Sequence, residues 1–182
     1  MRRSIETEPT SPAATERIRE EIARRRISRQ TLEGAYLTLR PSFGKPAAVY
    51  AYRTDIAWDA SETRLGFRET ERVDQDFAQF GHVTVPRQSG HIYLVTNRHG
   101  QHGLAILAHP LVTGEMHGLL TTLQAGNGAH LSPLATPIVL KPLNPGETAT
   151  FGRIAACEPA YNPYRTLLRR TIDGQFASIV LP

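Results

Sequence analysis

Cysteine is nearly absent from this sequence, whose 182 residues contain only Cys157. A single cysteine excludes an intramolecular disulfide framework and fits a protein of a reducing compartment. Lysine is also scarce, because Lys45 and Lys141 are the only lysines among 21 basic residues. The arginine bias extends along the whole chain, so we favour genome composition over a dedicated phosphate site as its explanation.

Long apolar runs are missing as well. No stretch approaches the length of a membrane-spanning helix, and the N-terminal residues lack the apolar core of a secretory signal. We therefore expect a cytoplasmic protein without a membrane partner. The sequence also lacks a Gly-x-Ser-x-Gly elbow, a phosphate-binding loop and an HExxH motif, so we expect no enzyme, no catalytic residue and no cofactor.

What the chain does contain is a series of short apolar and β-branched runs between residues 81 and 141. Turn residues separate them, among them the Pro-to-Gly segment 86–90 and Gly-Asn-Gly at 126–128. Strands at this spacing, with no helical pattern between them, predict antiparallel pairing. The expected fold class is mainly β: an antiparallel, lipocalin-like barrel or a strongly curved sandwich over about residues 34–143.

Two alternating segments predict the first hairpin of this domain. In residues 48–58 the even positions are mostly apolar, whereas the odd positions include Arg53 and Asp55, which is typical of a half-buried strand. In residues 64–72, Leu65 and Phe67 share one face, whereas Arg64, Arg68 and Arg72 share the other. We therefore expect these three arginines on the outer surface of a hairpin.

Both ends of the chain carry different patterns. Residues 1–14 lack periodicity and predict a disordered tail. Residues 15–26 (TERIREEIARRR) predict an amphipathic helix with Glu–Arg pairs at i,i+4 spacing. Helical spacing returns over residues 160–170, and residues 175–181 form a last strand candidate.

The run IREEIARRR followed by ISRQTL resembles the opening of an XRE-type (Cro-like) helix-turn-helix domain. The blocks GAYLTLRPSFGKPAAVYAYRTDIAWD, SGHIYLVTNRHGQHGLAIL and PIVLKPL are similar to the C-terminal effector-type domain of bacterial regulators of that family. The resemblance implies a helix-turn-helix remnant at residues 15–33. It also implies a β-rich sensing domain at residues 34–182, with a helical extension from about residue 144.

In that family a third helix reads base edges in the major groove. Here strand-like sequence begins directly after residue 33, so the resemblance implies that DNA binding is lost or impaired. Contacts to DNA phosphates would fall to the arginines near the N-terminus, namely Arg24, Arg25, Arg26 and Arg29.

Aromatic side chains on the expected strands are our candidates for ligand contacts. A mostly apolar cavity with a few hydroxyl groups is typical of small-molecule sites inside β-barrels. The candidates are Tyr36, Tyr50, Tyr52, Trp58, Phe67 and Tyr93. The alternative for each is a purely structural role in the core.

Histidines raise the question of a metal site, because five of the seven lie between His82 and His109. His99 and His102 flank a Gly-containing turn in which both rings can be solvated. No cysteine or acidic residue lies nearby to complete a tetrahedral ligand set, so we expect no metal.

Taken together, these features predict the sensing or interaction domain of an XRE-type transcriptional regulator. Its expected partner is a small-molecule effector, and a homodimer is compatible with this prediction. Two alternatives stay open: a stand-alone, lipocalin-like binding protein, and an enzyme that uses histidine and arginine side chains in a cavity. An enclosed cavity would favour ligand binding, whereas a filled interior with an exposed apolar patch would favour protein interaction.

Overall fold

The computed structural model describes residue 16 and residues 31–86, 89–98, 101–125 and 130–180. The predicted tail, the predicted N-terminal helix apart from residue 16, and the four arginines at 24, 25, 26 and 29 lie outside these residues. The chain divides into two compact units, residues 1–32 and residues 33–182. All the strands belong to the second unit, which the following paragraphs describe.

The described part of the second unit contains nine strands, one 3-10 turn and one α-helix. The strands are β1 (Gly34–Pro41), β2 (Val49–Asp59), β3 (Arg64–Thr70), β4 (Phe80–Thr84), β5 (His91–Arg98), β6 (Gln101–Ala108), β7 (Met116–Ala125), β8 (Leu131–Pro142) and β9 (Gly152–Ile154). The turn is η1 (Gln75–Phe77), and the helix is α2 (Tyr161–Asp173).

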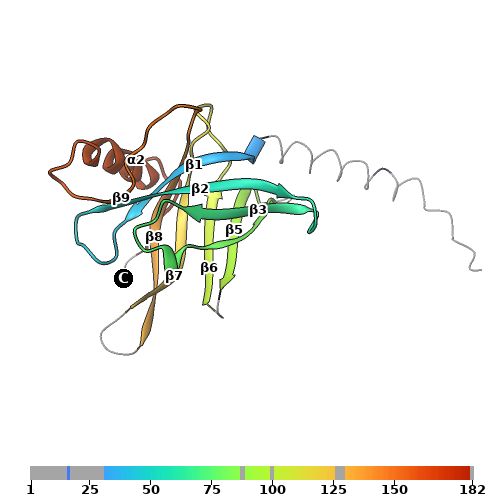
Figure 1. The fold of residues 1–182 in the computed structure, drawn as a ribbon, viewed down its shortest axis with the longest axis horizontal. Coiled ribbons are helices and arrows are strands. Elements are labelled where there is room, and N and C mark those ends of the chain that lie inside the picture. The colour runs from blue at the N-terminus through green and yellow to red at the C-terminus, as the bar shows by residue number, and fades with distance from the viewer. Residues whose placement is uncertain (1–15, 17–30, 87–88, 99–100, 126–129, 181–182) are drawn as a thin grey trace, which may run out of the picture. The chain divides into compact units, whose positions relative to one another are not determined.

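Strands β1 to β8 form a closed antiparallel barrel (Figure 1). Each strand pairs with the next along the chain, and β8 returns to pair with β1. At the point of closure Thr38 of β1 lies opposite Tyr52 of β2 on one side and Leu140 of β8 on the other. Closure leaves the eight strands without a free edge. The prediction of a mainly β fold is confirmed, and of its two alternatives the structure has the antiparallel barrel and not the curved sandwich.

The outer surface of β1, β2 and β8 is covered by α2 and the segment before it (Figure 1). Apolar side chains from both layers meet there and bury one another. The buried members are Leu37, Leu39, Val49, Ala51, Val139, Ile154, Tyr161 and Leu168. The protein therefore has one apolar cluster outside the barrel wall and a separate set of side chains inside it.

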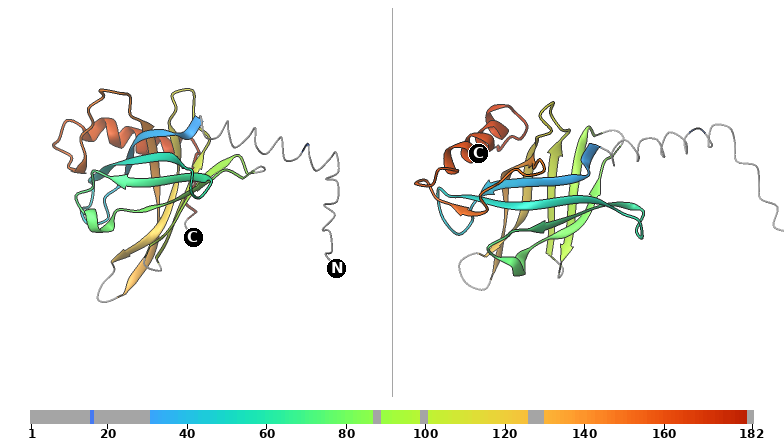
Figure 2. Two further views of the ribbon diagram at one scale, coloured as in Figure 1. Left: turned by 45° about the vertical axis from the view of Figure 1, so that its right-hand side comes forward. Right: turned by 45° about the horizontal axis from the view of Figure 1, so that its top comes forward.

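The barrel wall is strongly curved. Figure 2 shows the blue and cyan strands β1 and β2 running steeply across the green-to-orange strands β5 to β8. The close packing of β6 against β7 requires a glycine at position 118. An added Cβ there would lie 1.8 Å from the carbonyl oxygen of Ile106 on β6. Only a glycine allows the two backbones to approach so closely.

Two sequence predictions outside the barrel have clear outcomes. The helix predicted at 160–170 is present as α2, extended to Asp173. Between the barrel and the helix, the sequence around residues 148–156 is compatible with a strand, and the structure has the short strand β9 there, which pairs with the first residues of β2. The prediction of a last strand at residues 175–181 is wrong, because residues 175–180 form no strand.

Candidate functional site

Alternation along the strands determines which side chains enter the barrel. On β1, Thr38 and Arg40 face the interior, whereas Leu37 and Leu39 belong to the cluster beneath α2. The same period of two applies to the other strands. The interior is therefore composed mostly of every second residue, although Leu104 and Leu123 contribute to the cavity from the other phase of their strands. The chemical character of the interior changes from one end of the barrel to the other.

Apolar side chains fill the end of the barrel that carries the β2–β3, β4–β5 and β6–β7 connections. These side chains are buried, and none contributes to the cavity described below. They are Ile56, Leu65, Val83, Ile92, Leu107 and Met116. This end of the barrel is a packed core.

The opposite end holds a cavity of about 370 Å³. Its lining comes from every barrel strand except β4, together with residues of the β1–β2 and β3–β4 connections. The lining residues are Thr38, Arg40, Phe43, Gly44, Tyr52, Thr54, Phe67, Glu69, Arg72, Asp74, Phe77, Gln79, Leu94, Thr96, Gly103, Leu104, Ala105, Leu120, Thr122, Leu123, Gln124, Leu131, Ile138 and Leu140. Phe77, Leu123 and Leu131 are also solvent-exposed. The cavity therefore reaches solvent at this end, which we call the mouth.

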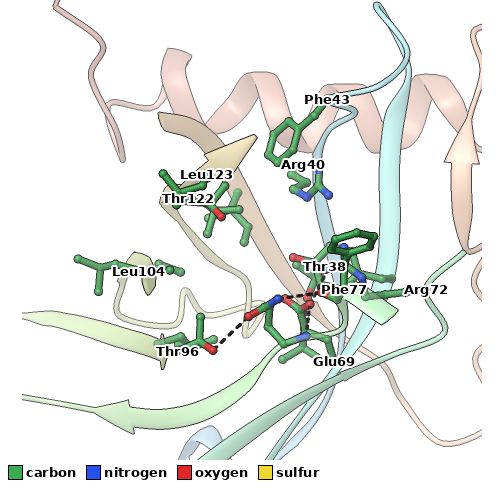
Figure 3. Close-up of a pocket in the computed structure, with 18 of the residues that line it drawn as sticks. Thr38, Arg40, Phe43, Glu69, Arg72, Phe77, Thr96, Leu104, Thr122 and Leu123 are labelled. Carbon is green, nitrogen blue, oxygen red and sulfur yellow. Dashed lines mark hydrogen bonds and ion pairs between the residues drawn. The ribbon is translucent and has the colours of Figure 1, made fainter. Parts of the chain in front are cut away.

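One side of the cavity is polar. This polar wall comes from β1, β2, β3 and the residues that follow β3, and consists of Thr38, Arg40, Tyr52, Thr54, Glu69, Arg72 and Asp74. The hydroxyl groups of Thr38 and Thr54 lie 2.6 Å apart and satisfy each other. Figure 3 shows Thr38, Glu69 and Arg72 gathered on this side.

Three charged groups of the polar wall form an ion-pair network. Arg72 donates from Nη1 to Oε2 of Glu69 over 2.6 Å and from Nε to Oδ1 of Asp74 over 3.0 Å. Glu69 also accepts from the backbone N–H of Gln79 at 3.0 Å, and Asp74 accepts from the Tyr50 hydroxyl. Burial alone would raise the pKa of Asp74, but the hydrogen bonds from Tyr50 and Arg72 bring that pKa below its ordinary value.

Arg40 has a different environment from Arg72. Its side chain is buried, and its one hydrogen bond within the described residues runs from Nη1 to the carbonyl oxygen of Pro41 at 3.0 Å. Its guanidinium carbon lies 3.8 Å from the ring centroid of Phe43 and 4.5 Å from that of Tyr50. Burial lowers the pKa of the Arg40 guanidinium; Tyr52 opposes this shift, and the positive charge of Arg72 adds to it.

The opposite side of the cavity is mostly hydrocarbon, although Thr122 and Gln124 of β7 also line the cavity. This apolar wall comes from β6, β7 and β8 and consists of Leu104, Ala105, Leu120, Leu123, Ile138 and Leu140. Figure 3 shows Leu104 and Leu123 across the cavity from Arg40 and Arg72. A molecule in the cavity would therefore meet charge and hydroxyl groups on one side and hydrocarbon on the other.

The six predicted ligand contacts separate into two groups. Tyr52 and Phe67 line the cavity. Tyr50 is buried beside it, with its ring centroid 5.6 Å from that of Tyr52. Burial raises the pKa of the Tyr52 phenol, which therefore stays protonated and able to donate a hydrogen bond.

The remaining three predicted contacts do not line the cavity. Tyr36 is buried one inward position beyond Thr38, towards the filled end of the barrel. Trp58 lies near the end of β2 and is only half-buried. Tyr93 alternates with the buried Ile92 and Leu94 and so lies on the outer side of β5.

Sequence reasoning missed the charged residues of the polar wall, and it placed Arg72 on the outer surface. That placement is wrong, because Arg72 is buried at the cavity. Strand β3 ends at Thr70, and Glu71 adopts a positive φ of 54°, which interrupts the alternation and turns the next side chain inward. The inward position of Arg40 and Glu69 could have been predicted from the sequence, because both residues alternate in step with the inward-facing side chains of their strands.

A second buried polar cluster lies outside the barrel, beneath the end of α2. His117 of β7 is fully buried, with Nδ1 3.0 Å from the hydroxyl oxygen of Thr171 and its ring stacked on Phe176. Its Nε2 has no hydrogen-bond partner among the residues that the structure describes and lies 3.6 Å from Oε2 of Glu115. Burial lowers the pKa of His117, although Glu115 acts in the opposite direction. The imidazole is therefore neutral near pH 7.

The histidine side chains that the structure describes are not grouped at the cavity. None of the described histidines lines it, and His99 lies outside the described residues. Across the described segments, no group of three or more His, Cys, Asp or Glu side chains is arranged to hold a metal ion.

Comparisons with known proteins identified no matching family profile, no significantly similar curated protein and no significantly similar solved structure. Among the helices in the described ranges, none has the length and apolar character required to cross a membrane.

Proposed function

We propose that this protein binds a small amphipathic molecule inside the barrel. The observation that carries the proposal is the cavity of about 370 Å³, in which a polar wall faces an apolar wall. Small-molecule sites typically occupy cavities of about 300 to 1,000 Å³, with mostly apolar linings and a few placed polar groups. A filled interior, as a purely structural barrel would have, is found only at the opposite end.

Ligand binding in the barrel is the activity that the sensing domain of an XRE-type regulator requires. The regulator context rests on the sequence resemblance and is part of the same proposal, together with impaired DNA binding. A stand-alone small-ligand binding protein would use the same cavity and is the alternative. Both assign the ligand to the same site, so one experiment tests what they share.

Binding inside the barrel can be tested with Nile red, an uncharged dye whose fluorescence rises in apolar surroundings. Ala105 lines the cavity, so Ala105→Phe would fill part of it. Ala57 is exposed on the outer face of β2, so Ala57→Phe adds the same side chain outside the barrel. We expect the wild type and Ala57→Phe to enhance the fluorescence of the dye and Ala105→Phe to lose that enhancement. Circular dichroism melts verify that each variant is folded.

Two results would contradict the proposal. One is the absence of any fluorescence enhancement with the wild type. The other is equal enhancement with a folded Ala105→Phe variant, which would place the dye on the surface of the protein.

A further inference from the structure

The cavity contains four charged side chains, and their pairing is uneven. Arg40 and Arg72 are cations, and Glu69 and Asp74 are anions, so their formal charges cancel. Both carboxylates, however, are bound to Arg72, at 2.6 Å and 3.0 Å. Arg40 forms no ion pair within the described residues. A network with excess negative charge therefore lies next to a cation that has no carboxylate of its own.

Most of the hydrogen-bonding capacity of Arg40 is unused. A guanidinium has five N–H donors, and the carbonyl oxygen of Pro41 takes one of them. The side chain is nonetheless only 6% exposed. Among the described residues, the unpaired nitrogen atoms of Arg40 are not enclosed by protein, so they are open to the cavity. An acceptor on a ligand can reach them there, and hydrogen bonds to a charged group are among the stronger ones.

The guanidinium of Arg40 is also held in position before any ligand arrives. The rings of Phe43 and Tyr50 lie 3.8 Å and 4.5 Å from its central carbon, and Figure 3 shows the Phe43 ring beside it. The carbonyl oxygen of Phe43 in turn accepts from Nε2 of Gln124 at 3.5 Å, across the mouth of the cavity. A preorganised donor loses less side-chain entropy on binding than a mobile one.

From these observations we infer that the ligand is a small amphipathic carboxylate. Its carboxylate group pairs with Arg40, and its hydrocarbon part lies against the apolar wall formed by β6, β7 and β8. This inference rests on the proposed function and specifies the ligand class of the same cavity. A carboxylate matches the site better than a phosphate does, because a planar guanidinium pairs with it in a bidentate manner and a single free cation balances a single negative charge.

Isothermal titration calorimetry at pH 7.5 with three ligands of eight carbon atoms each tests the inference. Octanoate carries the proposed head group, octanamide is its uncharged counterpart, and octyl phosphate carries the competing anion. The proteins are the wild type, Arg40→Gln, Arg40→Lys and Arg53→Gln. Arg53 is the matched control, because it pairs with Asp55 on the outer face of β2 with 43% of its side chain exposed.

We expect Arg40→Gln to weaken octanoate binding by about 10- to 100-fold, the usual effect of losing a hydrogen-bonded charge pair, and Arg40→Lys to weaken it less. Arg53→Gln should bind octanoate as the wild type does. Octanamide should bind the wild type more weakly than octanoate does, and its affinity should be insensitive to Arg40→Gln. The comparison of octanoate with octanamide on the wild type stands even if an Arg40 variant does not fold.

Three results would overturn the inference. They differ in whether the proposed binding of a ligand inside the barrel would still hold. Equal affinity of octanoate for the wild type and a folded Arg40→Gln variant would refute the role of Arg40, while binding in the barrel would stand. Tighter binding of octyl phosphate than of octanoate would replace the carboxylate by a phosphate. Failure of the wild type to bind any of the three ligands or Nile red would refute the proposed function as well.

Discussion

Nη1 of Arg72 lies 2.6 Å from Oε2 of Glu69 inside the barrel, where only 7% and 11% of the two side chains are exposed. Arg72 follows β3, and a left-handed backbone conformation at Glu71 turns it into the cavity. The pair connects the end of β3 to η1, because Asp74 and the backbone of Gln79 join the same network. Arg72 thereby pairs with two carboxylates at once, and neither of them forms an ion pair with Arg40.

Removing the arginine of this network should be strongly destabilising. Arg72→Met leaves Glu69 buried with its charge unpaired, and loss of one partner of a buried ion pair typically costs about 3 to 5 kcal/mol. Arg53→Met removes an exposed pair and should cost about 1 kcal/mol or less. Urea denaturation of both variants measures the difference. Equal losses of unfolding free energy would show that the Arg72 network contributes no more than a surface pair.

A glycine in the barrel wall offers a test of the strand packing. Gly118→Ala would place a Cβ 1.8 Å from the carbonyl oxygen of Ile106, a backbone atom that cannot move without disturbing β6. We expect a loss of about 3 kcal/mol or more, at the upper end of overpacking costs. The control is Gly66→Ala, where the nearest atom would lie at 3.5 Å, an ordinary contact. Chemical denaturation that gave similar midpoints for the two variants would contradict the β6–β7 geometry.

His117 should make the stability of the protein depend on pH. Burial keeps its pKa in the folded state below the unfolded value of about 6.5, so the unfolded state binds more protons as the pH falls. The unfolding free energy should therefore decrease below about pH 6.5, by at most about 1.4 kcal/mol per pH unit from this residue. Glu115 and Arg170 are the charged groups that face it.

Thermal or chemical unfolding between pH 5 and pH 7.5 measures this dependence, with His117→Gln as the comparison. The variant should lose the share of the pH dependence that His117 contributes. If the unfolding free energies of the wild type and the variant changed with pH in the same way, burial would not lower the pKa of His117 as we infer.

Periodicity was enough to predict the barrel wall but not its closure. Alternation from Ala48 to Trp58 assigned the correct face to Tyr50 and Tyr52, because period-two patterning reflects burial on one side of a strand. Pairing between Thr38 and Leu140 joins residues about a hundred positions apart and leaves no local trace in the sequence. For the same reason a barrel and a curved sandwich could not be distinguished beforehand.

The candidate site was predicted only in part, and the omissions have physical causes. Choosing the aromatic residues on the expected strands identified Tyr52 and Phe67, which line the cavity. The same choice also included Tyr93, which lies on the outer side of its strand. The inward phase of Arg40 and Glu69 was readable from their strands, yet charged residues are usually expected outside. Arg72 could not be placed, because a single left-handed residue before it reverses the pattern.

The central claim is that the ligand binds inside the barrel, and two alanines on opposite sides of the barrel wall test it. Ala105 lines the cavity, whereas Ala51 belongs to the cluster beneath α2, and both are buried. The measurement is a methyl NMR titration of alanine-labelled wild-type protein with octanoate. We predict a saturable shift of the Ala105 methyl signal and an unchanged Ala51 signal. A shift at Ala51 alone, or no shift at either methyl group up to saturating octanoate, would contradict binding in the cavity.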